Sequence, residues 1–185
     1  TFYGRVKATL NGDSPWSSSI STGTHANTPA GGSWSGVSAQ AVTVNWTANA
    51  NPAGTHFRVE LSSVAGFANT VLNQQVDAVS ASFSGLVPDT IYFARVKAIA
   101  HNGANTPYVV LTSSRTSPVA APQNLVFTGS TVSSLSAGWS ATIPAGDTHT
   151  LQIDDNSDFS SVTGSSVTAA VSATVTGLAL NTSYY

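Results

Sequence analysis

The sequence contains no cysteine and no methionine. Without cysteine there is no disulfide framework, no thiolate metal site and no thiol nucleophile. Charged residues make up only 8% of the 185 residues, against about 25% in an average soluble domain. The six Lys and Arg are outnumbered by eight Asp and Glu, so the sequence offers no basic face for nucleic acid or for anionic lipid. We therefore expect no nucleic-acid partner.

Long apolar runs are also missing. No run approaches the roughly 20 residues needed to cross a bilayer, so we expect no membrane span. The sequence begins at Thr1 with neither an initiator methionine nor a signal peptide, and we expect a fragment or a processed product.

What the sequence does contain is a corner followed by an alternating strand. Pro88 fixes its own φ, and the Asp and Thr that follow it are turn formers. From Tyr92 to Ala98 apolar residues alternate with Phe93, Arg95 and Lys97, which is typical of a half-buried strand. We expect Tyr92 to bury its ring and to hydrogen-bond the upstream backbone between Leu86 and Asp89.

This stretch recurs along the chain. The strand reappears at residues 2–8 and the corner at residues 178–185. Other markers recur at a similar spacing of about 92 residues: Trp46 with Trp139, Phe67 with Phe159, and Trp34 with Phe127. The spacing predicts tandem copies: the C-terminal part of one at 1–24, a complete one at 25–116, and the N-terminal part of a third at 117–185.

The middle copy is predicted to be entirely β. Strands are expected near 31–37, 41–48, 56–62, 70–76, 79–84, 91–100 and 107–114. Seven alternating strands in about 92 residues, separated by Gly, Pro and Asn, are typical of an antiparallel sandwich. The predicted fold class is therefore all-β, with tandem seven-stranded Ig-like sandwiches.

Each copy resembles a fibronectin type III domain. The resemblance rests on Pro122 with Leu125, on Trp46 and Trp139, and on the Leu-x-Pro-x-Thr-x-Tyr run over 86–92 with the strand after it. There are departures from the pattern: Phe2 stands in place of the corner tyrosine, Leu180 in place of the corner proline, and the middle copy begins without a match to Leu125. The resemblance implies a non-enzymatic module.

The structural residues follow from the alternation. Trp46 and Trp139 end inward-facing runs, so each is expected at the buried centre of its sandwich. The corner residues Leu86, Tyr92, Leu178 and Tyr184 complete this set. The expected inward residues of the middle copy are Trp34, Val42, Val44, Trp46, Phe57, Val59, Leu61, Phe67, Ala81, Phe83, Leu86, Tyr92, Ala94, Val96 and Ala98.

Few residues suggest ligand chemistry. Asp154, Asp155 and Asp158 form the one acidic cluster, and a loop of carboxylates could hold Ca²⁺. The alternative is a solvated hairpin loop, which we favour because the middle copy has no carboxylate there. The four histidines have no nucleophile or carboxylate placed beside them by sequence, so no catalytic residue and no cofactor are expected.

Two further features have competing interpretations. Asn11-Gly12-Asp13 lacks the Arg of an integrin-type Arg-Gly-Asp motif, and Asn-Gly is a favoured tight turn. Trp16 and Tyr108 hold matched positions and could stack on sugars, although packing on a neighbouring strand or domain is favoured.

We expect a structural or adhesive repeat segment of a long extracellular or cell-surface protein of bacterial type. Thr1 and Tyr185 fall at nearly the same phase of the repeat, which predicts a two-repeat slice of a longer chain or one subunit of a filament. Neighbouring copies, joined end to end or laterally, are the expected partners, with a cell-surface protein or a glycan as further partners. Two alternatives remain: a spacer or carbohydrate-binding module of a secreted polysaccharide-degrading enzyme, and a receptor ectodomain.

Overall fold

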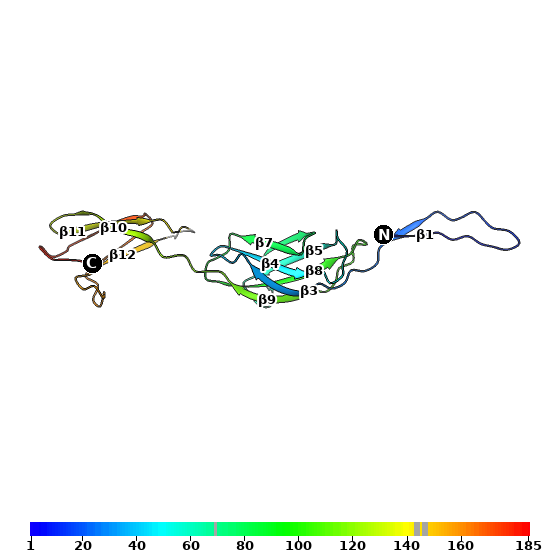
Figure 1. The fold of residues 1–185 in the computed structure, drawn as a ribbon, viewed down its shortest axis with the longest axis horizontal. Coiled ribbons are helices and arrows are strands. Elements are labelled where there is room, and N and C mark those ends of the chain that lie inside the picture. The colour runs from blue at the N-terminus through cyan, green and yellow to red at the C-terminus, as the bar shows by residue number, and fades with distance from the viewer. Residues whose placement is uncertain (69, 143–144, 146–147) are drawn as a thin grey trace. The chain divides into compact units, whose positions relative to one another are not determined.

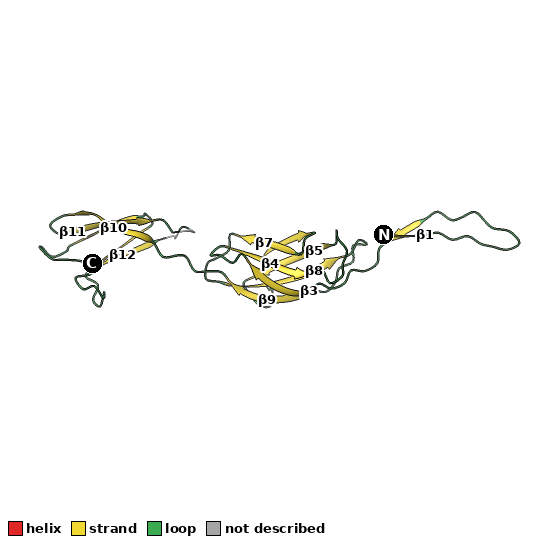
Figure 2. Ribbon diagram, viewed as in Figure 1, coloured by secondary structure: helices red, strands yellow, loops and turns green. Residues whose placement is uncertain are grey.

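A computed structural model describes the chain except for residues 69, 143–144 and 146–147, and the side chains of residues 70 and 71. The described residues form strands and no helix (Figures 1 and 2). This part of the chain therefore has no helix that is long and apolar enough to cross a membrane. They fall into two compact units, Thr1–Ser117 and Pro118–Tyr185. The strands are β1 (Phe2–Gly4), β2 (Ile20–Thr22), β3 (Ala30–Ser35), β4 (Ala41–Thr47), β5 (His56–Ser62), β6 (Thr70–Val76), β7 (Ser80–Ser84), β8 (Ile91–Ile99), β9 (Val109–Arg115), β10 (Gln123–Ser130), β11 (Ser134–Ser140), β12 (His149–Ile153), β13 (Gly164–Thr168) and β14 (Ser172–Thr176).

Strands β3 to β9 form a sandwich of two antiparallel sheets (Figure 1). One sheet has the order β3-β4-β7 and the other the order β6-β5-β8-β9. All seven strands lie where the sequence predicts them, and their ends differ by at most two residues, as at β9, which begins at Val109. The all-β sandwich prediction is confirmed.

The core of this sandwich comes from the inward faces of the two sheets. Val42, Val44 and Trp46 alternate along β4, and their counterparts on β8 run from Tyr92 to Ala98. The Trp46 indole meets the Phe57 ring edge to face, with the ring centres 5.7 Å apart. Burying a large apolar side chain contributes about 1.5–3 kcal/mol, so this inward set stabilises the domain strongly. Two predicted inward residues differ. Trp34 is only partly buried, and Phe67 is buried outside this core cluster, with the Arg95 guanidinium 4.5 Å from its ring.

The second unit is a smaller sandwich, with sheets ordered β10-β11-β14 and β12-β13. Its buried core is small: Ala137, Leu151, Ile153, Val175 and Leu178. The prediction that Trp139 is a buried centre is wrong, because Trp139 is only partly buried at the edge of this cluster. The physical reason is that the described part of this unit has no strands in the places that β8 and β9 take in the middle sandwich.

Residues 2–22 form a hairpin in which β1 pairs with β2, Phe2 opposite Thr22. Its apolar side chains face solvent: Val6 is 69% exposed and Ile20 is 78% exposed. Arg5 stacks on the Trp16 ring at 4.3 Å, and Lys7 lies 5.3 Å from the same ring centre. The stacking holds the ribbon together where it has no core.

Candidate functional site

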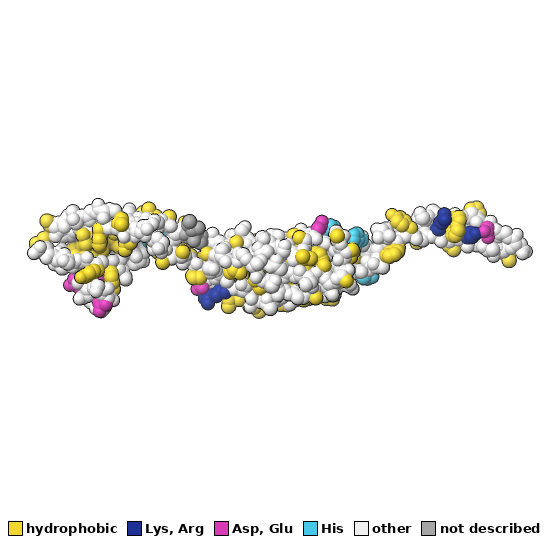
Figure 3. Space-filling view, viewed as in Figure 1, with side chains coloured by type: hydrophobic (Ala, Val, Ile, Leu, Met, Phe, Trp, Pro, Cys, Tyr) yellow, Lys and Arg dark blue, Asp and Glu magenta, His cyan; other side chains and the backbone are white. Residues whose placement is uncertain are grey.

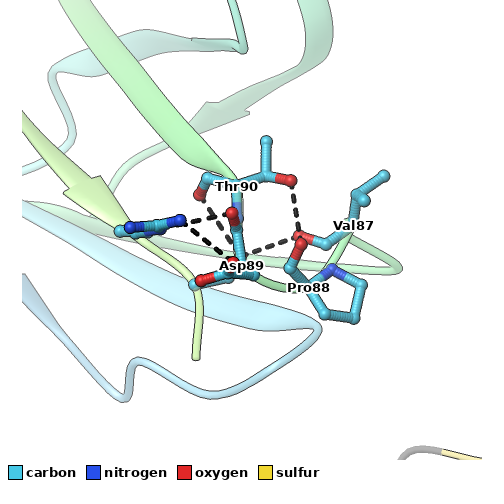
Figure 4. Close-up of polar contacts among 6 residues, drawn as sticks. Val87, Pro88, Asp89 and Thr90 are labelled. Carbon is cyan, nitrogen blue, oxygen red and sulfur yellow. Dashed lines mark hydrogen bonds and ion pairs between the residues drawn. The ribbon is translucent and has the colours of Figure 1, made fainter. Parts of the chain in front are cut away.

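Hydrogen bonds between side chains and backbone groups hold the corner before β8 (Figure 4). Tyr92 is 2% exposed, and its hydroxyl accepts a hydrogen bond from the Val87 N–H at 3.0 Å, within the range expected from the sequence. Asp89 adopts a left-handed φ of 52°, and the Thr90 hydroxyl donates to the Pro88 carbonyl at 2.9 Å. The sharp turn therefore satisfies its own polar groups, as the turn residues allow.

The segment after β9 locks this corner. Thr116 is 1% exposed, and its hydroxyl donates to the Val87 carbonyl at 2.7 Å and accepts from the Thr90 N–H at 3.0 Å. Arg115 adds an ion pair with Asp89 at 3.0 Å. The corner is thus a structural joint between the ends of β8 and β9.

A second corner lies at residues 178–184. The Ala179 N–H donates to the Tyr184 hydroxyl at 2.9 Å, and the Thr182 hydroxyl donates to the Leu180 carbonyl at 3.1 Å. Asn181 has φ 49°, matching Asp89. Leu180 in place of proline therefore leaves the corner unchanged, because the turn is fixed by the left-handed residue and the tyrosine hydrogen bond.

Replacing Tyr92 with phenylalanine is expected to destabilise the middle sandwich by about 1 kcal/mol. The Val87 N–H would lose its buried acceptor, while the ring would keep its packing. Urea unfolding followed by circular dichroism measures the change. The matched Tyr184→Phe variant should cost less, since that corner is more exposed; an unchanged midpoint for Tyr92→Phe would contradict this assignment.

The carboxylates of the acidic loop accept hydrogen bonds from groups of the same loop. Asp154 is fully buried, and its carboxylate accepts from Ser161 N–H at 3.3 Å and Thr163 hydroxyl at 3.2 Å. Burial raises the pKa of Asp154, but the hydrogen bonds from Ser161 and from its other donors outweigh it, so the pKa is lowered. Asp155 and Asp158 accept from Asn156 and Ser160. Among the described residues, no group of three His, Cys, Asp or Glu is placed to hold a metal ion.

The other sequence features also have structural partners. In the Asn11-Gly12 turn, Asn11 has φ 52° and the Asp13 carboxylate accepts from Lys7 and from the Thr9 hydroxyl. His56 contacts Asp77, and His149 packs on the Trp139 ring with centres 5.5 Å apart. These contacts support turn and packing roles.

Sequence reasoning missed a buried charged cluster on the outer face of β5, β8 and β9. Glu60 is 7% exposed, and its carboxylate accepts from Arg95 at 2.8 Å and from the Tyr108 hydroxyl at 2.5 Å. The Arg95 guanidinium lies between two rings, 4.5 Å from Phe67 and 4.3 Å from Tyr108. Alternation along Tyr92–Ala98 places Arg95 outward, but its partners depend on strand register, which the sequence leaves open.

The cluster shifts two pKa values. For Glu60, burial raises the pKa, but the hydrogen bonds from Tyr108 and Arg95 outweigh it, so the pKa lies below the usual 4.5. For Tyr108, burial and the hydrogen bond to Glu60 raise the pKa to about 12. The Tyr108 ring is covered by Arg95 and by Lys97, which lies 4.9 Å from its centre, so the ring packs rather than presenting a sugar-stacking face.

The cluster predicts a pH dependence of stability. Because the folded pKa of Glu60 is lowered, its ionised form stabilises the fold above the unfolded pKa, and this contribution is lost as pH falls through the folded value. Glu60→Gln is expected to cost about 1–2 kcal/mol at pH 7 and to flatten the decline below about pH 4.5. Urea titrations at several pH values measure both effects; an equal acid decline in wild type and variant would exclude Glu60 as its source.

Hydrophobic side chains gather on one face of the second unit (Figure 3). A cavity of about 550 Å³ in this unit is lined by Trp139, Leu151, Leu125 and Phe159, among others. Leu125 is 64% exposed and Phe127 is 53% exposed, unlike any Leu or Phe of the middle sandwich.

Comparison with protein families gives one match. Residues 27–113 match the fibronectin type III domain model, and this segment contains the two sheets and the corner described above. The chain carries a fibronectin type III domain. No curated protein sequence matches the chain.

A similarity to solved structures covers more of the chain than the family model does. A two-domain fibronectin type III segment of chicken tenascin is similar at 14% identity, with a TM-score of 0.58, covering 85% of this chain and 87% of that one. The sixth fibronectin type III domain of human fibronectin type III domain containing protein 3 is 25% identical, covering 56% of this chain and 97% of that one, with a TM-score of 0.44. The likeness to the tenascin segment gives the chain the fold of tandem fibronectin type III domains. Domains of the family that residues 27–113 match are structural or adhesive modules and are generally non-catalytic.

Proposed function

We propose that the chain is a non-enzymatic structural and adhesive segment of a long extracellular or cell-surface protein. In this proposal residues 25–116 are one complete repeat, and residues 1–24 and 117–185 belong to the repeats on either side. The observation that carries it is the recurrence of the same corner in two successive units, with both tyrosine hydroxyls bonded alike. Such joints fix strand ends within each repeat, which supports a structural role.

Composition supports an exposed location. The six Lys and Arg in 185 residues give few cleavage points to basic-specific proteases. Two of the six, Arg95 and Lys97, are stacked on the Tyr108 ring, which restricts their side chains further.

The carbohydrate-binding alternative needs uncovered aromatic rings on one sheet. The two candidate rings, Trp16 and Tyr108, are each stacked by a pair of cations from the neighbouring strand. These contacts support a packing role for both rings.

Location on intact cells tests the proposal. An antibody raised against the middle domain is expected to label unbroken cells of the source organism, and external protease is expected to remove the label. Labelling that appears only after lysis would contradict an extracellular role. A panel of purified polysaccharides tests the alternative, and we expect no retention of the chain on any of them.

A further inference from the structure

A row of three polar side chains crosses the outer face of the four-stranded sheet in the middle domain. Arg58 on β5 lies opposite Gln75 on β6 and opposite Lys97 on β8. Residues that lie opposite each other in antiparallel strands share a face of the sheet, with Cβ atoms about 5 Å apart. Val59, the next residue along β5, is buried in the core, so the row points away from the core. One amide and two cations therefore meet at one place on the surface.

The carboxylate beside this row is already used by other groups. Glu60 Oε2 accepts a hydrogen bond from Arg95 Nε at 2.8 Å, and Glu60 Oε1 accepts one from the Tyr108 hydroxyl at 2.5 Å. Arg58 Nε lies 3.4 Å from Glu60 Oε1, but it is buried and makes no hydrogen bond among the described residues. The Lys97 ammonium lies 4.9 Å from the centre of the Tyr108 ring. Within the part of the chain that the structure describes, Arg58 and Lys97 thus lack a hydrogen-bonded carboxylate.

The charges on either side of the row leave its two positive charges unbalanced. On one side Arg95 lies opposite Glu60, and the two form an ion pair at 2.6 Å. On the other side His56 contacts Asp77. The two cations of the row are like charges directly opposite each other, which is unfavourable between adjacent strands. An anion bound between them would remove this repulsion.

Both cations are held in place before any ligand binds. Arg58 Nη2 donates to Asn73 Oδ1 at 3.4 Å, while the Arg58 side chain remains 43% exposed and accessible to a ligand. The Lys97 ammonium lies against the Tyr108 ring, which is fixed by the hydrogen bond from its hydroxyl to Glu60. Groups that are positioned in advance lose less conformational entropy on binding. The row therefore has the geometry of a site rather than of two freely moving surface cations.

The second unit has no such row at the matching place. Thr150 stands there in place of Arg58 and lies opposite Val167, which stands in place of Gln75. The match follows from Leu151, which comes directly after Thr150 and is buried, as the residue after Arg58 is. The sandwich fold therefore does not itself require a row of cations on this face.

We propose that Arg58, Lys97 and Gln75 bind a doubly charged tetrahedral oxyanion, a phosphate or sulfate group. Two unbalanced positive charges match the two negative charges of such a group. The planar guanidinium can donate two parallel hydrogen bonds to a pair of its oxygens, the ammonium adds a point charge, and the amide donates from the third strand. Hydrogen bonds between ions are about twice as strong as neutral ones. The site goes beyond the proposed function, because it gives a structural segment a ligand.

Nuclear magnetic resonance on the whole chain tests the proposal. The probe is inorganic phosphate at about pH 8, where phosphate carries close to two charges, and sodium chloride holds the ionic strength constant. We expect saturable shifts of the backbone amides near residues 58, 75 and 97, with a Kd of about 1–10 mM. The amides around Thr150 are the internal control and should not shift, because the row is missing there.

Variants of the row make the test specific. Arg58→Gln and Lys97→Gln are each expected to weaken binding by about tenfold or more, whereas Lys97→Arg keeps the charge and should still bind. Arg115→Gln is the matched control, because it also removes one cation, but Arg115 pairs with Asp89 at the corner and lies outside the row. Shifts that do not saturate, or binding that weakens as much in Arg115→Gln as in Arg58→Gln, would overturn the proposal. Either result would mark a general attraction of anions to positive charge.

Two further probes test the charge of the ligand and identify its source. Perchlorate is tetrahedral with a single charge and is expected to bind about tenfold more weakly; equal binding would contradict a site for a dianion. Glycerol phosphate carries the doubly charged group on a larger molecule. Binding as tight as that of inorganic phosphate would identify esterified phosphate as a ligand, and clearly weaker binding would restrict the site to the free anion. None of these results affects cell-surface labelling, so the proposed function is judged separately.

Discussion

Replacing Trp46 with alanine is expected to lower the unfolding free energy of the middle domain by about 3–5 kcal/mol. Trp46 is 5% exposed, ends the inward run of β4 and contacts Phe57 edge to face. Its removal leaves a large cavity between the two sheets, which the rigid sandwich cannot close. Equilibrium urea unfolding followed by far-ultraviolet circular dichroism measures the loss.

Trp139→Ala is the matched comparison. Trp139 holds the same place on β11 but is only partly buried, so its loss should be clearly smaller. A Trp46→Ala change under about 1 kcal/mol would show that the centre of the sandwich lies elsewhere.

The second large effect is a clash that a second substitution relieves. Gly32→Leu is expected to destabilise the middle domain by about 1–3 kcal/mol, because a Cβ there meets Leu111 at 2.9 Å. Leu111→Ser alone is expected to cost about 2–3 kcal/mol through lost apolar burial. The double variant should be more stable than the sum of the two losses predicts, because the small serine leaves room for the new leucine.

A double-mutant cycle in urea measures this coupling. Additive losses would contradict this account, because they would mean that positions 32 and 111 do not share space. The uncoupled control combines Leu111→Ser with Ser35→Ala, which lies on β3 as Gly32 does.

The sequence was sufficient to predict the strands of the middle domain. Alternation is a local signal, and here it was uninterrupted along β4 and β8, so the strands were placed within two residues. The corner was also predictable, because a turn former with a left-handed φ and a tyrosine three residues later are close in sequence.

Long-range packing was not predictable in the same way. Trp139 lies in the same sequence pattern as Trp46, yet its burial depends on strands that β11 does not itself contain. The contact of Glu60 with Arg95 and Tyr108 required the register of three strands, and a lone glutamate in an alternating run gives no sign of it. The buried Asp154 was assigned to a solvated loop, because the donors that hold it follow it by up to nine residues.

Unfolding of residues 25–116 alone tests the central claim, that this segment is one complete repeat, most directly. The strands of its two sheets and the Tyr92 and Thr116 hydrogen bonds of its corner lie within the segment. The account predicts one cooperative urea transition for the isolated segment, at the midpoint that the same domain shows in the whole chain. An isolated segment that is unfolded, or that unfolds at a clearly lower urea concentration, would contradict it.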